Sequence, residues 1–328
     1  METRDQIQVE IDRLMKDYLD SKSLPLYDML SYHLGIHGLD PSLTIPKRNL
    51  GILLQTTVKA LGGNPSLTLP AAMSIEMLNA FCEIHDDVQS GNPTRNGQDS
   101  LWWVWGPAQA INAGDGMHSI ARLSILNIDR NHFSDHTAHG AVSFLDQGAL
   151  VTFEGRYRDL EMQERIDTTV EAYLEMAGQK TGSLYGSTLS IAAKLSGLDE
   201  KVCGNIFRSG HFIGQARQIK LDITQIWGPE SAQKIDFLNK KKLFPVVAVL
   251  QKATPSQKRK LGDVYFKRVL EDSDLDSVLE VLDDLEGRKL AMEQYIKAKD
   301  MAFSILRENL PDDRSEHLID SLETILEE

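Results

Sequence analysis

The 328-residue chain has few cysteines, no apolar run long enough to cross a bilayer and no excess of basic residues. Its two cysteines, Cys82 and Cys203, are too far apart in the sequence to suggest a disulfide framework or a thiolate zinc site. The longest apolar patch, LFPVVAVL, is interrupted by Pro245. A formal net charge of −13 disfavours nucleic acid or an anionic membrane as the main partner.

The first residues, METRDQIQVEIDRLMKDYL, are amphipathic and acidic. A signal peptide would need a basic end followed by an apolar core. We therefore expect a cytoplasmic protein without a membrane span.

Helical periodicity dominates the rest of the sequence. Apolar side chains recur at the spacing of one helix face in two stretches: Ile7, Ile11, Leu14 and Tyr18, then Leu275, Leu279, Leu282 and Leu285. Alternating patterns of strand type are nearly absent, and turn signals such as GGNP, SGNP and WGPES separate the helical stretches. The sequence predicts one all-α domain over residues 1–328, which by itself could be a helical scaffold or an interaction protein.

Four helical segments carry polar residues where a packed core would need apolar ones. They are EIHDD, FEGRYRDLEMQ, GQKTGSLYG and GHFIGQARQIKLDITQ. Taken singly, each is readily explained as a capped helix end or a surface ion pair. Together they indicate polar side chains that project into a shared cavity, as they do in helix bundles with an internal site.

These segments resemble, in order, the motifs of one enzyme family. EIHDDVQSGNPTRNG resembles that family's first aspartate-rich motif, which is DDxxD followed by RRG, and AQAINAGDG resembles the helix that follows this motif in the family. EGRYRDL, KTGSLY, GQARQIKLDITQ and NKKKLFPVV follow in the expected sequence between about residue 45 and about residue 250. The chain thus resembles the trans-isoprenyl diphosphate synthases, also called polyprenyl synthetases.

The resemblance implies an all-α isoprenoid synthase fold, a single large helical bundle around a central cavity, and commonly a homodimer. In that family Mg²⁺ ions help an allylic prenyl diphosphate to ionise, and the prenyl cation is then captured by isopentenyl diphosphate. The implied catalytic residues are Asp86, Asp87, Lys180, Thr181, Gln218 and Asp222, of which the three aspartates would bind the metal. The implied diphosphate ligands are Arg95, Lys180, Lys241 and Lys47. Phe81 falls at the chain-length floor, the bottom of the cavity that limits the length of the prenyl chain in this family.

Several positions depart from the family pattern. Ser90 replaces the last aspartate of the first aspartate-rich motif. In GQARQIKLDITQ, which lies where the family has its second aspartate-rich motif, Leu221 and Gln225 replace two aspartates. Leu50, Asn79 and Asn96 replace cationic or histidine residues that the family uses to bind isopentenyl diphosphate. Because each charge-assisted bond contributes roughly 1.5 to 3 kcal/mol, these losses would strongly weaken binding of that acceptor.

Three hypotheses follow. The first is a prenyltransferase that ionises a geranyl-, farnesyl- or geranylgeranyl-type diphosphate but uses another acceptor, or lets the cation cyclise or capture water. The second is a non-catalytic partner or regulatory subunit, which would form a heteromer with a competent synthase. The third is an ordinary chain-elongating synthase with substituted ligands. The persistence of Asp86, Asp87, Lys180 and Gln218 together favours the first.

Overall fold

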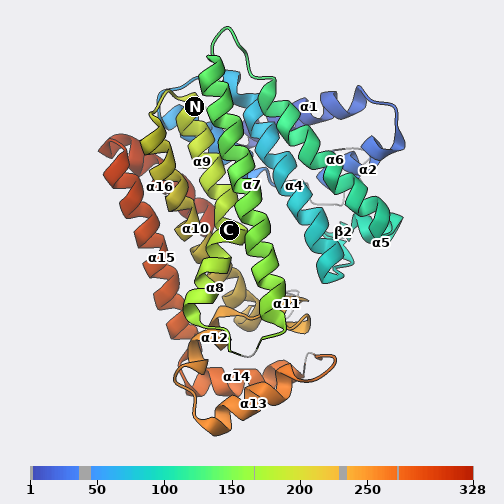
Figure 1. Ribbon diagram of the computed structural model, residues 1–328, viewed down its shortest axis with the longest axis vertical. Coiled ribbons are helices and arrows are strands. Elements are labelled where there is room, and N and C mark those ends of the chain that lie inside the picture. The colour runs from blue at the N-terminus through green and yellow to red at the C-terminus, as the bar shows by residue number, and fades with distance from the viewer. Residues whose placement is uncertain (1–2, 37–45, 166, 229–234, 272, 328) are drawn as a thin grey trace. The chain divides into compact units, whose positions relative to one another are not determined.

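The computed structural model describes residues 3–36, 46–165, 167–228, 235–271 and 273–327. Within these ranges the chain is almost entirely helical, and the strands are confined to one short hairpin (Figure 1). The all-α prediction is therefore confirmed. None of the described helices is long and apolar enough to cross a membrane.

Contacts between backbone positions divide the chain into two compact units. The first unit comprises Met1–Gln147, Ser187–Gly204 and Pro311–Ile325, and the second comprises Gly148–Gly186, Asn205–Leu310 and Leu326–Glu328. Several helices have residues in both units. A single domain over residues 1–328 stays a prediction.

The first unit contains the N-terminal helices and the hairpin. Its elements are α1 (Arg4–Asp20), α2 (Pro25–Leu34), α3 (Asn49–Ala60), a 3-10 turn (Pro65–Thr68), α4 (Leu69–Ser90), β1 (Thr94–Arg95), β2 (Gln98–Asp99), α5 (Leu101–Trp105) and α6 (Pro107–Leu126). It also holds the beginning of α7 (Asp135–Gln163), most of α9 (Ser183–Leu195) and most of α16 (Asp312–Glu327). The helix α4 packs against α3 and α6, which places its apolar face in the core.

The helix α1 forms where periodicity predicts it. Thr3 caps its first turn, and the side chain of Gln6 completes the capping box. The buried stripe is Ile7, Ile11, Met15 and Leu19, so its second half is shifted by one residue from the predicted Leu14 and Tyr18. Leu14 and Tyr18 are half-buried beside it. A stripe with a four-residue step stays on one face because an α-helix has 3.6 residues per turn.

The second unit contains the end of α7, most of α10 (Glu200–Trp227), and α8 (Val170–Ala177), which continues into a single π-helical turn (Gly178–Gly182). The remaining helices are α11 (Ile235–Leu238), α12 (Phe244–Leu250), α13 (Pro255–Tyr265), α14 (Asp274–Asp284) and α15 (Gly287–Asn309). Phe237, Val249, Val278 and Leu282 are fully buried members of the core that joins α10 to α14. The predicted stripe on α14 is confirmed in part, since Leu275 and Leu282 are buried while Leu279 and Leu285 are partly buried. Figure 1 shows α13 and α14 packed side by side.

Candidate functional site

The first aspartate pair lies in the last turns of α4. The helix ends at Gly91, which adopts a left-handed conformation, and the backbone N–H of Asn92 donates to the carbonyl of Asp87 over 3.0 Å. This is the usual glycine-terminated helix end. It leaves Asp86 partly exposed and turns Asp87 into the protein, where only 2% of it is accessible.

Asp87 is held by a two-pronged ion pair. Nε of Arg95 donates to Oδ2 over 2.8 Å, and Nη2 donates to Oδ1 over 2.7 Å. The side chain of Asn92 also donates to Oδ1, over 3.1 Å. Burial raises the pKa of Asp87, and the pairing with Arg95 offsets only part of that rise. The predicted neighbours Asp87 and Arg95 therefore bind each other.

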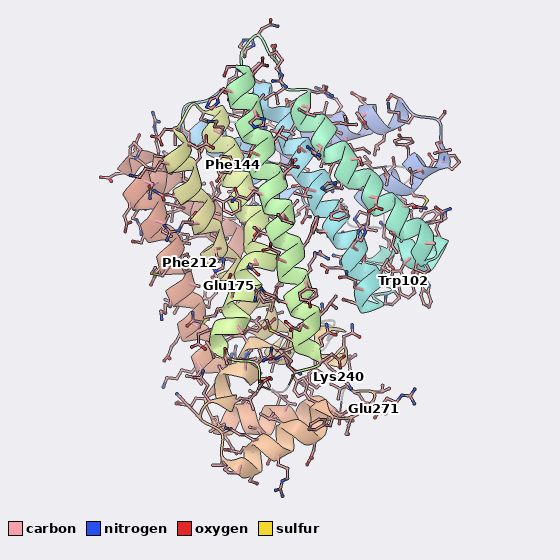
Figure 2. The ribbon with its side chains drawn as sticks, viewed as in Figure 1. Trp102, Phe144, Glu175, Phe212, Lys240 and Glu271 are labelled. Atoms are coloured by element: carbon pink, nitrogen blue, oxygen red, sulfur yellow. The ribbon has the colours of Figure 1, made fainter. Side chains whose placement is uncertain are left out.

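A hairpin presents Arg95. Its turn is Asn96-Gly97, with φ of 53° and 80°, and Arg95 pairs with Gln98 across it. Asn-Gly is the preferred sequence for a two-residue turn in which both residues have positive φ. Asn96, which replaces an arginine of the family motif, thus forms a turn with Gly97 that was not predicted from the sequence. Trp102, labelled in Figure 2, anchors the segment, because its ring nitrogen donates to the Asn92 carbonyl over 2.7 Å.

Glu83 lies one helical turn before Asp87 and competes for the same cation. Its carboxylate is 4.0 Å from Nη1 of Arg95 and 3.5 Å from the ring nitrogen Nε2 of His33, and it accepts from Asn79 over 3.0 Å. Burial raises the pKa of Glu83, but His33 and Arg95 outweigh it and lower the pKa to about 2. The position of the Glu83 carboxylate beside Asn79 was not predicted from the sequence.

A small cavity of about 20 Å³ lies beside Glu83, lined among others by Lys47, Arg48, Glu76 and Asn79. Lys47 is exposed, whereas Arg48 is buried and donates to Asp12 over 2.7 Å and to the carbonyl of Leu34. Arg48 thus joins α1 to α2. Glu76 accepts from the backbone N–H of Gly51 over 2.6 Å, and burial raises its pKa to about 7 although Arg48 opposes this.

Phe81 is half-buried on α4, two turns before Asp87. Its ring centroid lies 4.4 Å from that of His85 and 5.3 Å from that of His118, which belongs to α6. Burial lowers the pKa of His118. The assignment of Phe81 to a chain-length floor stays a prediction.

In the second unit, Lys180 and Thr181 lie in the π-helical turn. Two glycines on neighbouring helices allow this turn to pack closely: a Cβ on Gly155 would come within 2.2 Å of the Lys180 backbone, and one on Gly214 within 2.1 Å of the Gly182 backbone. Lys180 Nζ donates to Asp159 over 2.6 Å, and the Thr181 hydroxyl donates to Gln218 over 3.2 Å. The structure thus brings together residues from the EGRYRDL, KTGSLY and GQARQ motifs.

Asp222 is fully buried and accepts three hydrogen bonds from uncharged groups. Oδ2 accepts from the Tyr173 hydroxyl and, over 2.6 Å, from the backbone N–H of Phe244, while Oδ1 accepts from Gln218 over 3.0 Å. Burial raises the pKa of Asp222 to about 7, because these donors offset only part of the desolvation. Leu221, beside it, is 40% exposed.

Lys241 also forms a close ion pair in the second unit. Its Nζ lies 2.6 Å from Oδ1 of Asp236, whose Oδ2 accepts from Gln225 over 2.6 Å. Burial raises the pKa of Asp236, but Lys241 and Lys180 outweigh it, and the net pKa is lowered. Lys241 and Gln225 lie in predicted motifs, whereas Asp236, which contacts both of them, was not predicted from the sequence.

The described residues include no group of three or more metal-binding side chains that could hold an ion by themselves. Both oxygens of Asp87 and both oxygens of Asp222 accept hydrogen bonds within the protein. Asp86 is the aspartate of the predicted metal set that is partly exposed. Because Mg²⁺ in proteins is often bound by one or two carboxylates together with substrate phosphates and water, Asp86 fits such an ion. The assignment of Asp87 and Asp222 to the metal stays a prediction.

The sequence matches the polyprenyl synthetase family over residues 42–282. The chain belongs to this family. A geranylgeranyl diphosphate synthase of Mycobacterium tuberculosis is 30% identical over 239 residues, which cover 71% of this chain and 67% of that protein. A (2E,6E)-farnesyl diphosphate synthase of Mycobacterium bovis is 28% identical over 289 residues, covering 85% and 78%.

Solved structures of polyprenyl synthetases have the same fold. A polyprenyl synthetase from Streptomyces coelicolor superposes with a TM-score of 0.86 at 24% identity, covering 98% of both chains. A geranylgeranyl pyrophosphate synthetase from Pyrococcus horikoshii gives 0.85 at 22% identity, covering 99% of this chain and 98% of that one. The predicted all-α isoprenoid synthase fold is confirmed.

Proposed function

We propose that this polyprenyl synthetase is a prenyltransferase that binds an allylic prenyl diphosphate and does not use isopentenyl diphosphate as its acceptor. The observation that carries the proposal is the contrast in charge between two sets of residues. In the second unit Lys180 and Lys241 are held in place by Asp159 and Asp236. In the first unit, the residues around Asn79 include the carboxylates of Glu76 and Glu83.

The cations of the second unit suit a diphosphate. Lysine ammonium groups bind phosphate oxygens as compact point charges. An ammonium group has three protons and can donate to several oxygens at once. Thr181 lies beside Lys180 in the π-helical turn and donates to Gln218 of α10. Their shared role is to hold the leaving diphosphate.

The first unit contains Asp86 and Arg95. Asp86 is a carboxylate that fits a magnesium ion, and such an ion would neutralise charge on a leaving diphosphate. Arg95 is half-buried beside Asp87 and Glu83, and its pKa is raised, because these carboxylates outweigh the effect of burial. We expect Arg95 to position Asp86 and Asp87 at the end of α4, and Lys47, which is exposed, to contribute only weakly.

The surroundings of Asn79 disfavour isopentenyl diphosphate. That molecule carries a diphosphate, and a carboxylate such as Glu83, with a pKa of about 2, repels it at neutral pH. A neutral or cationic acceptor, cyclisation of the prenyl cation or its capture by water are the outcomes compatible with this charge.

A second candidate function is a non-catalytic partner of a competent synthase. It is favoured because groups of the protein itself donate hydrogen bonds to the carboxylates of Asp87 and Asp222, which leaves few carboxylate oxygens to bind a metal ion. A regulatory subunit would form a heteromer, whereas we expect the prenyltransferase to be a homodimer. Light scattering of the purified protein, alone and with a motif-complete synthase, distinguishes these assemblies.

The test is release of pyrophosphate from geranyl, farnesyl and geranylgeranyl diphosphate in the presence of Mg²⁺. We expect release with at least one substrate and no change when isopentenyl diphosphate is added. Asp86→Ala should reduce the rate by about 100-fold or more, as expected for loss of a group that stabilises the leaving charge. Asp313→Ala, an exposed aspartate on α16, is the matched control and should leave the rate unchanged.

The opposite results are equally informative. No release from any of the three substrates would exclude the prenyltransferase and support the partner subunit. Acceleration by isopentenyl diphosphate, with longer prenyl diphosphates as products, would show an ordinary chain-elongating synthase.

A further inference from the structure

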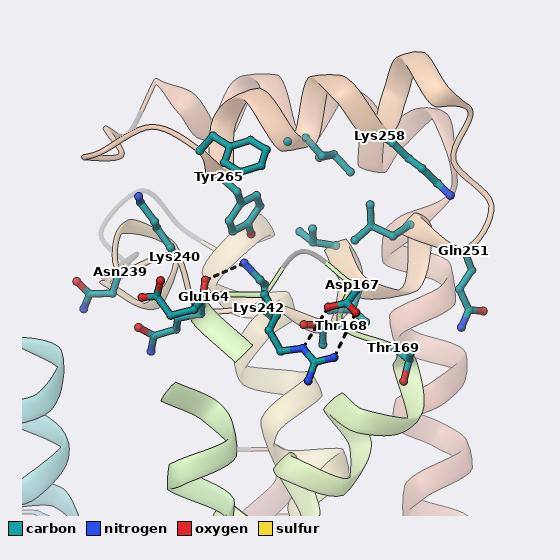
Figure 3. A pocket seen from close by; sticks show the side chains of 18 of the residues that line it. Glu164, Asp167, Thr168, Thr169, Asn239, Lys240, Lys242, Gln251, Lys258 and Tyr265 are labelled. Atoms are coloured by element: carbon teal, nitrogen blue, oxygen red, sulfur yellow. Dashed lines mark hydrogen bonds and ion pairs between the residues drawn. The ribbon is translucent and has the colours of Figure 1, made fainter. Parts of the chain in front are cut away.

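The second unit contains a large pocket away from the residues discussed so far. Its volume is about 790 Å³, and it lies between the α7–α8 connection, the loop at residues 239–242, α12 and α13 (Figure 3). None of Lys180, Gln218, Asp222 and Lys241 lines it. A pocket of this volume is large enough for a ligand of drug size.

The pocket is basic although the protein is acidic. Five cationic side chains line it, against two carboxylates, those of Glu164 and Asp167. Arg165 is paired with Asp167 over 3.1 Å. Among the described residues no ion pair neutralises Lys240, Lys258 or Arg268. An anion would therefore be attracted to this pocket in a chain whose net charge is −13.

One wall of the pocket is apolar. Leu238 of α11, Leu250 of α12 and Phe266 at the end of α13 line it and keep accessible surface, and Phe266 is 70% exposed. Apolar surface of this kind gains free energy when an aliphatic chain covers it, at about 25 cal/mol per Å². A small hydrophilic anion would leave this wall uncovered.

Two buried polar groups at the pocket lack partners. The hydroxyl oxygens of Tyr265 and Thr168 are inaccessible and form no hydrogen bond with any described residue. Figure 3 shows the Tyr265 hydroxyl pointing from α13 towards Lys242. The ammonium of Lys242 lies 4.6 Å from the centre of the Tyr265 ring and donates to the Gln163 carbonyl over 3.4 Å. Because buried polar groups are normally paired, these hydroxyls point to a ligand.

We infer that this pocket is a second binding site for an amphiphilic phosphate, a molecule with a phosphate head and an aliphatic tail. Lys240 and Lys242 hold the head, and the apolar wall formed by Leu238, Leu250 and Phe266 covers the tail. The site is independent of the proposed prenyltransferase reaction, since it shares no lining residue with the groups assigned to that reaction. Its occupant can come from isoprenoid or from straight-chain lipid metabolism.

The experiment measures binding of dodecyl phosphate and of farnesyl monophosphate by titration calorimetry. The full-length protein is kept in EDTA, without any allylic diphosphate, so that failure of the prenyltransferase proposal does not affect the result. We expect one molecule to bind per chain, with inorganic phosphate binding about 100-fold or more weakly because it lacks the tail. The tighter of the two amphiphiles identifies the source of the tail.

Three variants locate the site. A Cβ on Gly262 would meet only the ring of Phe266, at 3.7 Å, so Gly262→Leu can be accommodated on α13 while its side chain fills the pocket. Leucine also forms helix more readily than glycine. Gly262→Leu and Lys242→Met should each weaken binding about tenfold or more. Lys260→Met, also on α13 but paired with Glu280 outside the pocket, should bind within about twofold of the unchanged protein.

Absence of binding by both amphiphiles would overturn the inference. So would binding that survives Gly262→Leu and Lys242→Met unchanged, because the molecule would then lie elsewhere. Thermal melts of each variant confirm folding. If Gly262→Leu does not fold, Lys242→Met with its control Lys260→Met still decides the question.

Discussion

Asp87 in the first unit and Asp222 in the second are both almost completely buried, but their partners differ in charge. Asp87 is bound by the guanidinium of Arg95. Asp222 is bound by a phenol, an amide side chain and a backbone N–H, all of them uncharged. In both cases the donors offset only part of the effect of burial, so the pKa of each aspartate is raised. For Asp222, whose donors are uncharged, the pKa rises to about 7.

The two aspartates therefore stabilise different things. Asp87 fixes the hairpin that follows α4, because Arg95 lies on β1. Asp222 joins three elements, since its partners belong to α8, α10 and the start of α12. Loss of Arg95 would leave Asp87 buried with Asn92 as its remaining donor, whereas displacement of Asp222 would leave three donors without their acceptor.

The largest expected effect comes from removing the cation. Arg95→Ala leaves Asp87 buried with Asn92 as its remaining donor, and we expect a loss of about 3 kcal/mol in the free energy of unfolding. Arg122→Ala is the matched control, because its ion pair with Asp146 is exposed and should contribute about 0.5 kcal/mol. Urea denaturation measures both. Equal losses would show that Asp87 does not depend on its cation.

The next effect concerns pH. The folded-state pKa of Asp222, about 7, lies above the unfolded value of about 4, so the folded protein binds this proton more readily. The free energy of unfolding should therefore fall as the pH rises from about 4 to about 7. Asp222→Asn cannot ionise and should have a flatter pH profile, gaining stability relative to the unchanged protein above about pH 7.

Urea denaturation between about pH 5 and about pH 8 measures this slope. Glu76, whose pKa is also raised to about 7, contributes with the same sign, and Glu76→Gln reports its share. A pH profile unaltered by Asp222→Asn would contradict the raised pKa of Asp222.

The smallest effect compares the loops that follow the two aspartate motifs. Asn96 and Lys240 both have positive φ, at 53° and 59°. Asparagine tolerates this conformation, whereas lysine is strained there. Lys240→Gly should raise the free energy of unfolding by about 0.5 kcal/mol, and Asn96→Gly should change it by less. A gain for Asn96→Gly that equals or exceeds the gain for Lys240→Gly would contradict this reading of the two turns.

The helical fold could be predicted from periodicity because each helix carries its own apolar stripe. The shift on α1 from Leu14 and Tyr18 to Met15 and Leu19 could not, because both sets lie at helical spacing from Ile11. Which of the two faces is buried depends on the neighbouring helices. The residues of α1 alone therefore do not predict it.

The candidate site was predictable to the extent that its residues lie within motifs. Lys180, Gln218 and Lys241 are close to other motif residues, as expected. The partners of Asp222 were not predictable, since Tyr173 and Phe244 are 49 and 22 residues away along the chain. The pairing of Arg95 with Asp87 was not predicted either, because it depends on the Asn-Gly turn that brings β1 back to the helix; a role of Arg95 in diphosphate binding stays a prediction.

The three consecutive lysines at residues 240–242 do not share one environment. Lys241 pairs with Asp236, while Lys240 and Lys242 line the pocket below α13. Lys241 ties this loop to α11 through Asp236, and Lys242 ties it to the end of α7 through the Gln163 carbonyl. Neighbouring lysines in one tripeptide therefore fasten the same loop to two different helices.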